Sequence, residues 1–245
     1  MISALILFAV GVKPLVHAHS HNDYDKPRPL AEALELGFCS IEADVFLVDG
    51  DLLVAHDRNK VDKARTLKSM YLEPLNDLAK KNRGRIYPGG PQVTLLVDIK
   101  ADGEKVYQVL KQQLKGYPAL VQKGWKGALS VVISGDRPIA TIEADKDQLC
   151  SIDGRAVDLD SESRAVSMIS ENWMNHFKYT GLTPISDEEL AKLKDFIKRA
   201  HAKKRKLRFW ATAERPVFWK TLLDAGVDLI GTDKNQELAD FLRSR

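Results

Sequence analysis

Two carboxylates, Glu42 and Asp44, stand two residues apart in a β-patterned stretch of the chain, SIEADVFLV. Side chains at positions i and i+2 of a strand lie on one face, so these carboxylates should project into the same space. The intervening Ala43 and the flanking Ile41 and Val45 give the opposite face to an apolar core. Paired carboxylates of this kind suit a hard divalent cation, Mg²⁺ or Ca²⁺.

Histidines lie close to this pair. The segment HAHSHND places His19 and His21 at the end of an apolar run, and His56 follows the hairpin-like segment LVDGDLLVAHD. Imidazole titrates near neutral pH and can move protons in both directions. Two histidines at neighbouring strand or hairpin ends, His19 and His56, could therefore serve as base and acid. His21 shares the face of His19 if the strand continues.

A third apolar run, VTLLVDIK, ends in Asp98 and Lys100. Together with Glu42 and Asp44, Asp98 would supply three oxygen donors for one divalent cation, with positions left for water and substrate oxygens. Such a cation would clamp a phosphate, and Lys100 would offset the negative charge that builds on phosphorus. These residue types are what phosphodiester cleavage requires.

Eight apolar runs rich in β-branched residues could position these groups, near residues 15–19, 40–45, 93–99, 129–134, 149–152, 166–170, 207–212 and 228–232. Eight is the number of strands in a closed parallel barrel. Helical patterns separate most of the runs, and this alternation predicts parallel strands with crossover helices. We expect an α/β fold, a slightly irregular (β/α)8 TIM barrel with a small β-hairpin insertion after the second strand. An open, doubly wound sheet is the alternative.

The helical patterns are PLAEALELG, YLEPLNDLAKK, EKVYQVLKQQL, DEELAKLKDFIKRAHAKKRK, PVFWKTLLDAG and QELADFLRSR. No convincing helical pattern lies between the fifth and sixth runs.

In a TIM barrel the catalytic groups lie at the carboxyl ends of the strands. Polar or ionisable residues recur there: His19–Asp23, Glu42 and Asp44, Asp98 and Lys100, Ser134 and Asp136, Ser170–Asn172, Trp210, and Thr232 and Asp233. The sequence therefore predicts one shared site at the carboxyl ends of the barrel strands.

The chain has 245 residues, of which 44% are hydrophobic, and it suits one large domain. Residues 1–12 are a candidate signal peptide because ISALILFAVGV is apolar and too short to span a bilayer, although no positive charge precedes it. We therefore expect a single domain over 13–245 in a secreted or periplasmic protein, or a cytoplasmic one if the N-terminus is retained. Cys39 and Cys150 are expected to be small buried residues.

The net charge of +3 is small, and no interleaving of basic and aromatic residues predicts nucleic-acid binding. The basic run 192–208 reads as a helix with a solvated face, since acids come early and bases late. A weak contact with an anionic surface is the other interpretation, so we allow for transient membrane contact. No obligate protein partner is evident, and the expected partner is a phosphodiester small molecule or a phospholipid head group.

Over nearly its whole length the chain resembles the glycerophosphodiester phosphodiesterase and phosphatidylinositol-specific phospholipase C-like superfamily. The segment from AHSHNDY to LLVAHD has the superfamily's order of histidine, helix, Glu-x-Asp, hairpin and His-Asp. VDIK resembles its third-strand acid followed by lysine, and FWATAE and GVDLIGTD resemble its late strands. The His-Arg-Gly and Glu-Asn-Thr motifs of glycerophosphodiesterases are absent. In this the chain looks closer to the sphingomyelinase D branch and to the fungal altered-inheritance-of-mitochondria family.

The resemblance implies a TIM barrel with phosphoric diester hydrolase activity. It implies His19 and His56 as the catalytic pair, and Glu42, Asp44 and Asp98 as ligands of one Mg²⁺ or Ca²⁺. Substrate-site residues would be Lys100 and Trp210, to which the sequence adds Asn22 and His21 as candidates. A substrate hydroxyl near phosphorus would give a cyclic phosphate by intramolecular attack; otherwise water attacks.

Two other functions fit parts of the sequence. His17, His19 and His21 also resemble the His-x-His opening of amidohydrolase-like metal enzymes, which take further histidines from later strands; only His176 and His201 remain after His56. A barrel that binds phosphorylated head groups without catalysis is the third interpretation. Zinc dependence would favour the amidohydrolase-like function, and metal binding without turnover would favour the binding protein.

Overall fold

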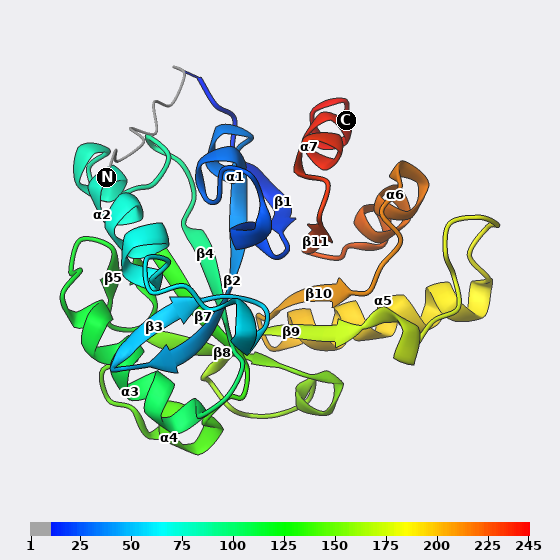
Figure 1. Ribbon diagram of the computed structural model, residues 1–245. Helices are drawn as coiled ribbons and strands as arrows, with labels where there is room; N and C mark the ends of the chain where they lie inside the picture. The colour runs from blue at the N-terminus through cyan, green and yellow to red at the C-terminus, as the bar shows by residue number, and fades with distance from the viewer. Residues whose placement is uncertain (1–10) are drawn as a thin grey trace.

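The computed structural model describes residues 11–245, which form a closed barrel of eight parallel strands surrounded by helices (Figure 1). The barrel strands are β1 (Leu15–Ser20), β2 (Phe38–Val48), β4 (Val93–Ile99), β7 (Leu129–Gly135), β8 (Cys150–Gly154), β9 (Val166–Asn172), β10 (Lys206–Trp210) and β11 (Leu229–Thr232). Each strand pairs with the next, and β1 pairs with both β2 and β11, which closes the ring. The predicted (β/α)8 barrel is confirmed, and the open-sheet alternative is wrong.

The eight strands lie close to the eight apolar runs. Parallel strands in this fold are covered on both faces, so they read as nearly continuous apolar sequence. Cys39 and Cys150, at two of these strand starts, are buried free thiols. Residues 1–10 of the candidate signal peptide lie outside the described residues, so that expectation stays a prediction. No helix in the described chain is long and apolar enough to cross a membrane.

Alternation along β2 gives its two faces different environments. Ile41, Ala43 and Val45 are buried in the main hydrophobic core, whereas Glu42 and Asp44 face the barrel interior. A small separate cluster fills the interior nearer the amino ends of the strands: Leu96, Val132, Met168 and Leu229. Two residues further along three of these strands stand Asp98, Ser134 and Ser170. The interior is therefore apolar at its floor and polar at the carboxyl ends.

The hairpin after β2 carries the chain back alongside the carboxyl-terminal end of β2. β2 pairs antiparallel with β3 (Asp51–Val54), which confirms the predicted insertion. Asp49 and Gly50 at its tip have φ values of 51° and 86°. Positive φ at both central positions makes a type I′ turn, for which Asp-Gly is favoured. After β3, the Ala55 N–H donates to the Asp44 carbonyl at 3.2 Å, and this fixes His56 beside Asp44.

Helices surround the barrel (Figure 1): α1 (Ala31–Glu35), α2 (Glu73–Lys81), α3 (Gly103–Lys115), α4 (Ile139–Ala144), α5 (Asp187–Ala202), α6 (Pro216–Ala225) and α7 (Asn235–Arg243). All but α4 overlap predicted patterns; α3 extends beyond its pattern by one residue at each end, and α7 by one residue at its start. Between β8 and β9 the described chain has only the 3₁₀ turn η4 (Ala156–Asp158), at the predicted gap. Further short elements are η1 (Asp23–Asp25), η2 (Arg58–Lys60), the π-turn η3 (Lys68–Leu72), η5 (Trp173–Asn175), β5 (Val121–Gln122) and β6 (Lys126–Gly127).

The basic segment differs from its prediction at its end. Helix α5 stops at Ala202 instead of continuing through Lys206, and Lys204 takes a left-handed conformation with φ 58°. The guanidinium of the next residue, Arg205, is buried and donates to three carbonyls in the loop after η4, those of Leu159, Ser161 and Ser163, at 2.7–3.1 Å. A buried guanidinium needs such acceptors. The last residues of the basic run are therefore structural, and Lys206 to Arg208 belong to β10.

Candidate active site

A cavity of about 230 Å³ opens at the carboxyl ends of the barrel strands. It is lined by His21, Asn22, Glu42, His56, Asp98, Lys100, Ser134, Asp153, Arg155, Ser170, Arg208 and Trp210. Seven of the nine residues singled out in the sequence are in this set. Asp44 lies beneath His56 and Lys100, in contact with both. His19 is buried below the cavity.

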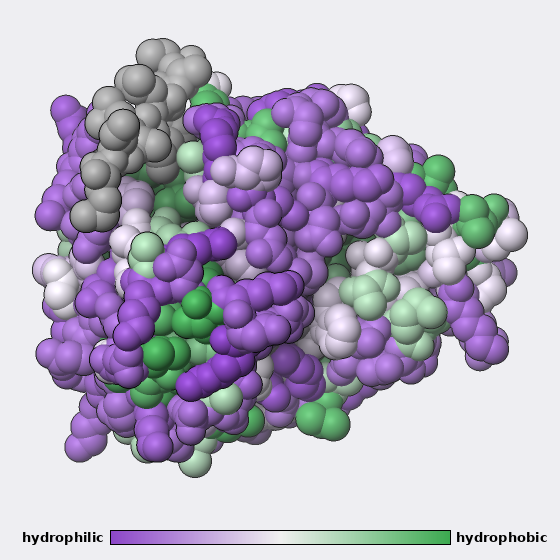
Figure 2. Space-filling model, viewed as in Figure 1, coloured by the Kyte–Doolittle hydropathy of each residue, from purple (hydrophilic) through white to green (hydrophobic). Residues whose placement is uncertain are grey.

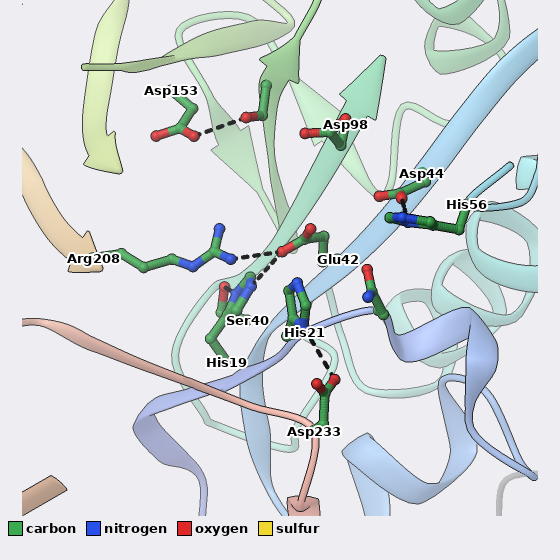
Figure 3. Close-up of polar contacts among 12 residues, drawn as sticks. His19, His21, Ser40, Glu42, Asp44, His56, Asp98, Asp153, Arg208 and Asp233 are labelled. Carbon is green, nitrogen blue, oxygen red and sulfur yellow. Dashed lines mark hydrogen bonds and ion pairs between the residues drawn. The ribbon is translucent and has the colours of Figure 1, made fainter. Parts of the chain in front are cut away.

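Glu42 is the centre of a buried ion pair. Its Oε2 accepts from Arg208 Nη2 at 2.9 Å and from His19 Nε2 at 2.9 Å (Figure 3). Burial by itself would raise the pKa of Glu42, but Arg208 and His19 lower it below the usual range. Glu42 is thus a carboxylate at any working pH. Sequence patterns did not single out Arg208, because it read as part of a solvated basic run.

Asp44 collects three donors on one oxygen. Its Oδ2 accepts from the Tyr24 hydroxyl at 2.6 Å, from Lys100 Nζ at 2.7 Å and from His56 Nδ1 at 3.0 Å. Lys100 also reaches Asp98 Oδ1 at 3.1 Å. The other oxygen of Asp44, Oδ1, is buried and has no hydrogen-bond partner. Burial raises the pKa of Asp44, with Lys100 and Tyr24 opposing that rise.

His19 and His21 have different environments. His19 is completely buried, its Nδ1 accepts from Ser40 Oγ at 2.7 Å, and its Nε2 donates to Glu42. Burial, together with Arg208, lowers the pKa of His19 to about 4, so it is neutral at physiological pH. His21 lines the cavity, and Figure 3 shows it between Asp233 and Glu42. The expected catalytic role of His19 therefore lacks a path to a substrate in the cavity.

The two imidazoles that line the cavity are held in the same way. His21 Nδ1 lies 3.0 Å from Asp233 Oδ1, and His56 Nδ1 lies 3.0 Å from Asp44 Oδ2. In each ring a carboxylate fixes Nδ1, and within the described chain Nε2 has no hydrogen-bond partner. Burial opposes protonation of His21, but Asp233 outweighs it and raises the pKa of His21 above its ordinary value. The hydrogen bond from His21 in turn lowers the pKa of Asp233 to about 2.

Asn22 and Trp210 stand at the mouth of the cavity. Asn22 follows β1 in a left-handed conformation with φ 45°, and its amide oxygen lies 2.9 Å from the Tyr24 hydroxyl. Trp210, the last residue of β10, is 41% exposed. Both side chains are accessible to a molecule entering the cavity.

A second polar wall, formed by the ends of β7, β8 and β9, was only partly foreseen. Ser134 and Ser170 were noted as polar strand ends, but Asp153 and Arg155 were not connected with the site. Asp153 Oδ2 accepts from Ser134 Oγ at 2.9 Å and from Arg155 Nη1 at 2.9 Å. The signal in the sequence was weak, since DGRAVDLD reads as an ordinary polar loop.

The three predicted metal ligands fit a hard cation by donor chemistry. Asp44 and Asp98 are register partners on adjacent strands, and Glu42 precedes Asp44 by two residues on the same face. The partnerless Oδ1 of Asp44 is a buried acceptor that a cation would satisfy. As they lie, no three His, Cys, Asp or Glu side chains among residues 11–245 gather tightly enough to enclose an ion. Lys100 and Arg208 instead neutralise these carboxylates.

The remaining histidines do not join the cavity. His17 Nδ1 lies 2.8 Å from the Asp228 carbonyl, and His201 Nε2 lies 2.8 Å from the Asp228 carboxylate. His176 packs against Phe196. The three-histidine opening noted in the sequence therefore sends only His21 into the cavity.

Sequence comparison connects this site with a family of proteins. Residues 7–150 match a family described as the AIM6-like phosphodiesterase domain. The altered inheritance of mitochondria protein 6 homolog of Arthroderma benhamiae is 30% identical over 259 residues, covering 91% of this chain and 82% of the relative. Altered inheritance of mitochondria protein 6 of Eremothecium gossypii is 26% identical over 282 residues, covering 98% of this chain and 72% of the relative.

Solved structures share the barrel. A glycerophosphodiester phosphodiesterase from Parabacteroides distasonis superposes with a TM-score of 0.57 at 18% identity, covering 94% of this chain and 98% of that one. A calcium-dependent phosphoinositol-specific phospholipase C from a Pseudomonas species gives 0.54 at 15% identity, covering 89% and 88%. At these identities the likeness is one of fold. The match over more than half of the sequence, with a relative 30% identical along most of both chains, shows that the protein belongs to the AIM6-like phosphodiesterase domain family.

Proposed function

We propose that the protein is a metal-assisted phosphoric diester hydrolase in which His21 and His56 perform the acid–base chemistry. The observation that carries the proposal is their common arrangement. Each ring is anchored through Nδ1 by a carboxylate and leaves Nε2 open toward one cavity that also contains Lys100. This replaces His19 of the expected pair by His21, because His19 is buried with both ring nitrogens occupied.

The two imidazoles differ in what they can do. Asp233 raises the pKa of His21 and so favours its imidazolium, which can donate a proton to the departing alkoxide. In the neutral tautomer whose Nδ1 donates to Asp44, His56 has a lone pair on Nε2 that can take the proton of the attacking hydroxyl or water. Lys100 Nζ, beside Asp44 and Asp98, offsets the charge that builds on the phosphoryl oxygens.

Glu42, Asp44 and Asp98 would hold the divalent cation, Mg²⁺ or Ca²⁺. Bound there, it would supply positive charge against the phosphate and lower the cost of the negative transition state. The support is the donor chemistry and the partnerless Asp44 oxygen. The engagement of the same carboxylates by Arg208 and Lys100 favours a second candidate, a barrel that binds phosphorylated head groups without cleaving them.

The volume of the cavity supports the proposal that only the head group of a substrate enters it. Pockets for drug-sized ligands usually measure roughly 300–1,000 Å³, so about 230 Å³ admits a phosphate and its alcohol but no acyl chain. Acyl chains would stay outside, which is consistent with a phospholipid and with transient membrane contact. A soluble phosphodiester with the same head group would enter equally well.

The rim around the cavity supports the membrane contact. Seven large hydrophobic side chains are exposed in the described chain. Six lie at the ends of β7–β10, in the connections that follow, or in the first turn of the next helix: Ile139, Val157, Met174, Leu182, Trp210 and Val217. Figure 2 shows such side chains at its right-hand tip, where Figure 1 draws the loop before α5. Exposed apolar groups beside a site mark surfaces that meet membranes or partners.

Product release from a panel of phosphodiesters tests the proposal. The panel contains glycerophosphodiesters, sphingomyelin, lysophospholipids and phosphoinositides, each with Mg²⁺, Ca²⁺, Zn²⁺ or EDTA. Cleavage that EDTA abolishes and Mg²⁺ or Ca²⁺ restores is the expected result. A cyclic phosphate product would identify intramolecular attack, and a monoester would identify water. Binding without turnover throughout would favour the head-group-binding barrel, and a requirement for zinc would favour an amidohydrolase-like enzyme.

A further inference from the structure

We propose that Glu214 is a positioning residue of the active site, which fixes the segment that carries Asp233 and thereby holds the His21 ring in place. The inference rests on the proposed function, because it concerns the imidazole assigned there as the general acid. Glu214 lies in the connection between β10 and α6, within the segment FWATAE. Within the described chain its hydrogen bonds go to Thr232 and Asp233, so it acts on the ring through Asp233.

Burial does not hold the Asp233 side chain in place. This side chain is 53% exposed, and it follows the last residue of β11. A carboxylate with that exposure can adopt several rotamers, and its contact with His21 Nδ1 at 3.0 Å uses one of them (Figure 3). Neighbouring groups must therefore fix the backbone and the oxygen atoms of Asp233 to keep it on the ring.

Glu214 fixes the backbone of this segment with one oxygen. Its Oε1 accepts from the Thr232 hydroxyl at 2.7 Å and from the backbone N–H of Asp233. The Thr232 hydroxyl in turn accepts from the Lys234 N–H at 2.9 Å. Hydrogen bonds to a charged acceptor are stronger than neutral ones. One carboxylate thus orders three successive residues at the end of β11.

Two further contacts join the same segment to the chain around His21. The His21 N–H donates to the Thr232 carbonyl at 3.1 Å, so the ring and its carboxylate extend from backbones that are bonded to each other. Lys26 Nζ donates to the Asp233 carbonyl at 3.0 Å and to its Oδ1 at 3.1 Å. Lys26 and His21 therefore bind the carboxylate, whereas Glu214 binds the backbone that carries it.

Glu214 is poorly placed to bind the substrate. It does not line the 230 Å³ cavity, and it lines instead a smaller pocket of about 120 Å³ together with His21 and Asp233. A carboxylate there would repel an anionic phosphodiester. Replacement of Glu214 should therefore change the state of the His21 ring and leave KM unchanged.

Other charges act on His21 and are the same in every variant at position 214. Asp233 and Glu42 favour the protonated ring, and Arg208 opposes it. The titratable and charged groups around the ring come from β1, the segment after η1, β2, β10, β11 and the rest of the cavity wall: His19, Lys26, Glu42, Arg208, Asp233, His56, Asp98, Lys100, Asp153 and Arg155. A change seen on replacing Glu214 is thus separable from their effects.

The pH dependence of kcat/KM for glycerophosphoinositol, whose leaving group is an alkoxide, tests the positioning role. In Glu214→Ala the alkaline limb should move to lower pH, because Asp233 stays on Nδ1 for less of the time and the ring loses its proton more easily. The movement should not exceed that of Asp233→Asn. Glu214→Gln keeps an acceptor oxygen and should keep the wild-type profile.

Coupling to Asp233 distinguishes positioning from a general loss of stability. In the Asp233→Asn background, Glu214→Ala should cause no further movement of the alkaline limb. Additive movements, an unmoved limb in Glu214→Ala, or a Glu214→Gln profile like that of Glu214→Ala would overturn the positioning role.

Glu189→Ala is the matched control. Glu189 Oε1 also accepts from two donors of a neighbouring segment, the N–H groups of Lys178 and, at 3.1 Å, Tyr179. It lies on α5 and does not line the cavity. Its loss should lower the free energy of unfolding and leave the pH profile unchanged.

NMR of the ring nitrogens of His21 tests the same role without turnover. When the ring is neutral, its contact with Asp233 keeps the proton on Nδ1, and Glu214→Ala should increase the share of the Nε2–H tautomer. Glu214→Gln and Glu189→Ala should keep the wild-type ¹⁵N shifts. If Glu214→Ala does not fold, Thr232→Val takes its place, because it removes the hydroxyl that donates to Glu214.

This measurement separates the two failures. If no phosphodiester is cleaved, the hydrolase function fails, and a change of tautomer in Glu214→Ala would still support the positioning of His21. Ring shifts that are identical in wild type and in the folded variant would overturn the positioning role, whatever the activity.

Discussion

Asp233 sets the protonation of the cavity histidine that lies next to it. Because this carboxylate raises the pKa of His21, the imidazolium needed as general acid persists to a higher pH than an isolated histidine would allow. Asp233→Asn removes the effect, so the pKa of His21 should fall. The alkaline limb of the plot of kcat/KM against pH should then move to lower pH, while kcat/KM on the acidic side of the optimum should stay unchanged. An unchanged alkaline limb in Asp233→Asn would exclude His21 as the acid.

His19 should affect stability more than catalysis. Its pKa falls from about 6.5 in the unfolded chain to about 4 in the folded protein, so between these values the unfolded state binds more protons. The free energy of unfolding should therefore decrease as pH falls from about 6.5 to about 4, by about 3 kcal/mol from this group. His19→Gln keeps a donor for Glu42 and should flatten that dependence in urea titrations at several pH values. The same slope in wild type and variant would contradict this assignment.

The sequence could not separate His19 from His21 because their difference arises from barrel closure. The two residues are of the same type and stand two positions apart at the end of one strand, so local sequence patterns do not distinguish them. β1 ends at Ser20. His19 therefore lies inside the barrel beside Ser40 and Glu42, whereas His21 lies beyond the end of the strand. Glu42, Asp44, Asp98 and Lys100 were easier to predict, since strand alternation alone places them.

At the scale of elements, the ion pair between β10 and β2 is a cross-barrel link. Arg208 and Glu42 are both buried, and removing one partner of such a pair typically costs about 3–5 kcal/mol because the other charge stays buried. Arg208→Met should therefore lower the free energy of unfolding by about that amount. The double variant Arg208→Met with Glu42→Gln should recover part of the loss, as measured by urea denaturation.

The exposed pair of Lys220 and Asp224 on α6 supplies the control. Lys220→Met should leave the denaturation midpoint unchanged, because surface ion pairs contribute little. A double variant no more stable than Arg208→Met alone would show that the two charges are not energetically coupled.

The eight strands were predictable because each is buried on both sides and reads as an apolar run. Arg208 was not, because a charged residue inside a strand contradicts that pattern, and its meaning depends on Glu42, 166 positions away. Helix α4, with the sequence IATIEA, was not among the predicted helices. Contacts between residues that are far apart in the sequence, such as Asp153 and Ser134, cannot be predicted from local sequence patterns.

For the molecule as a whole, the apolar rim predicts binding to lipid vesicles with the cavity facing the bilayer. Leu182 and Val157 are 76% and 90% exposed on connections that follow β9 and β8. Replacing both with aspartate should weaken co-sedimentation with phospholipid vesicles and leave hydrolysis of a soluble diester unchanged. Val16→Asp is the control, since Val16 is 49% exposed but lies at the beginning of β1. Equal vesicle binding by the rim variant would place the contact elsewhere.

The most direct test of the account is a ³¹P NMR time course on glycerophosphoinositol with wild type, His21→Ala and His56→Ala, each shown to be folded. Wild type with Mg²⁺ or Ca²⁺ should convert the diester signal to a monoester or cyclic phosphate. Each alanine variant should be slower by about 10²–10⁴-fold, the usual contribution of a general acid or base. Undiminished conversion by His21→Ala would contradict the central claim that His21 is half of the catalytic pair.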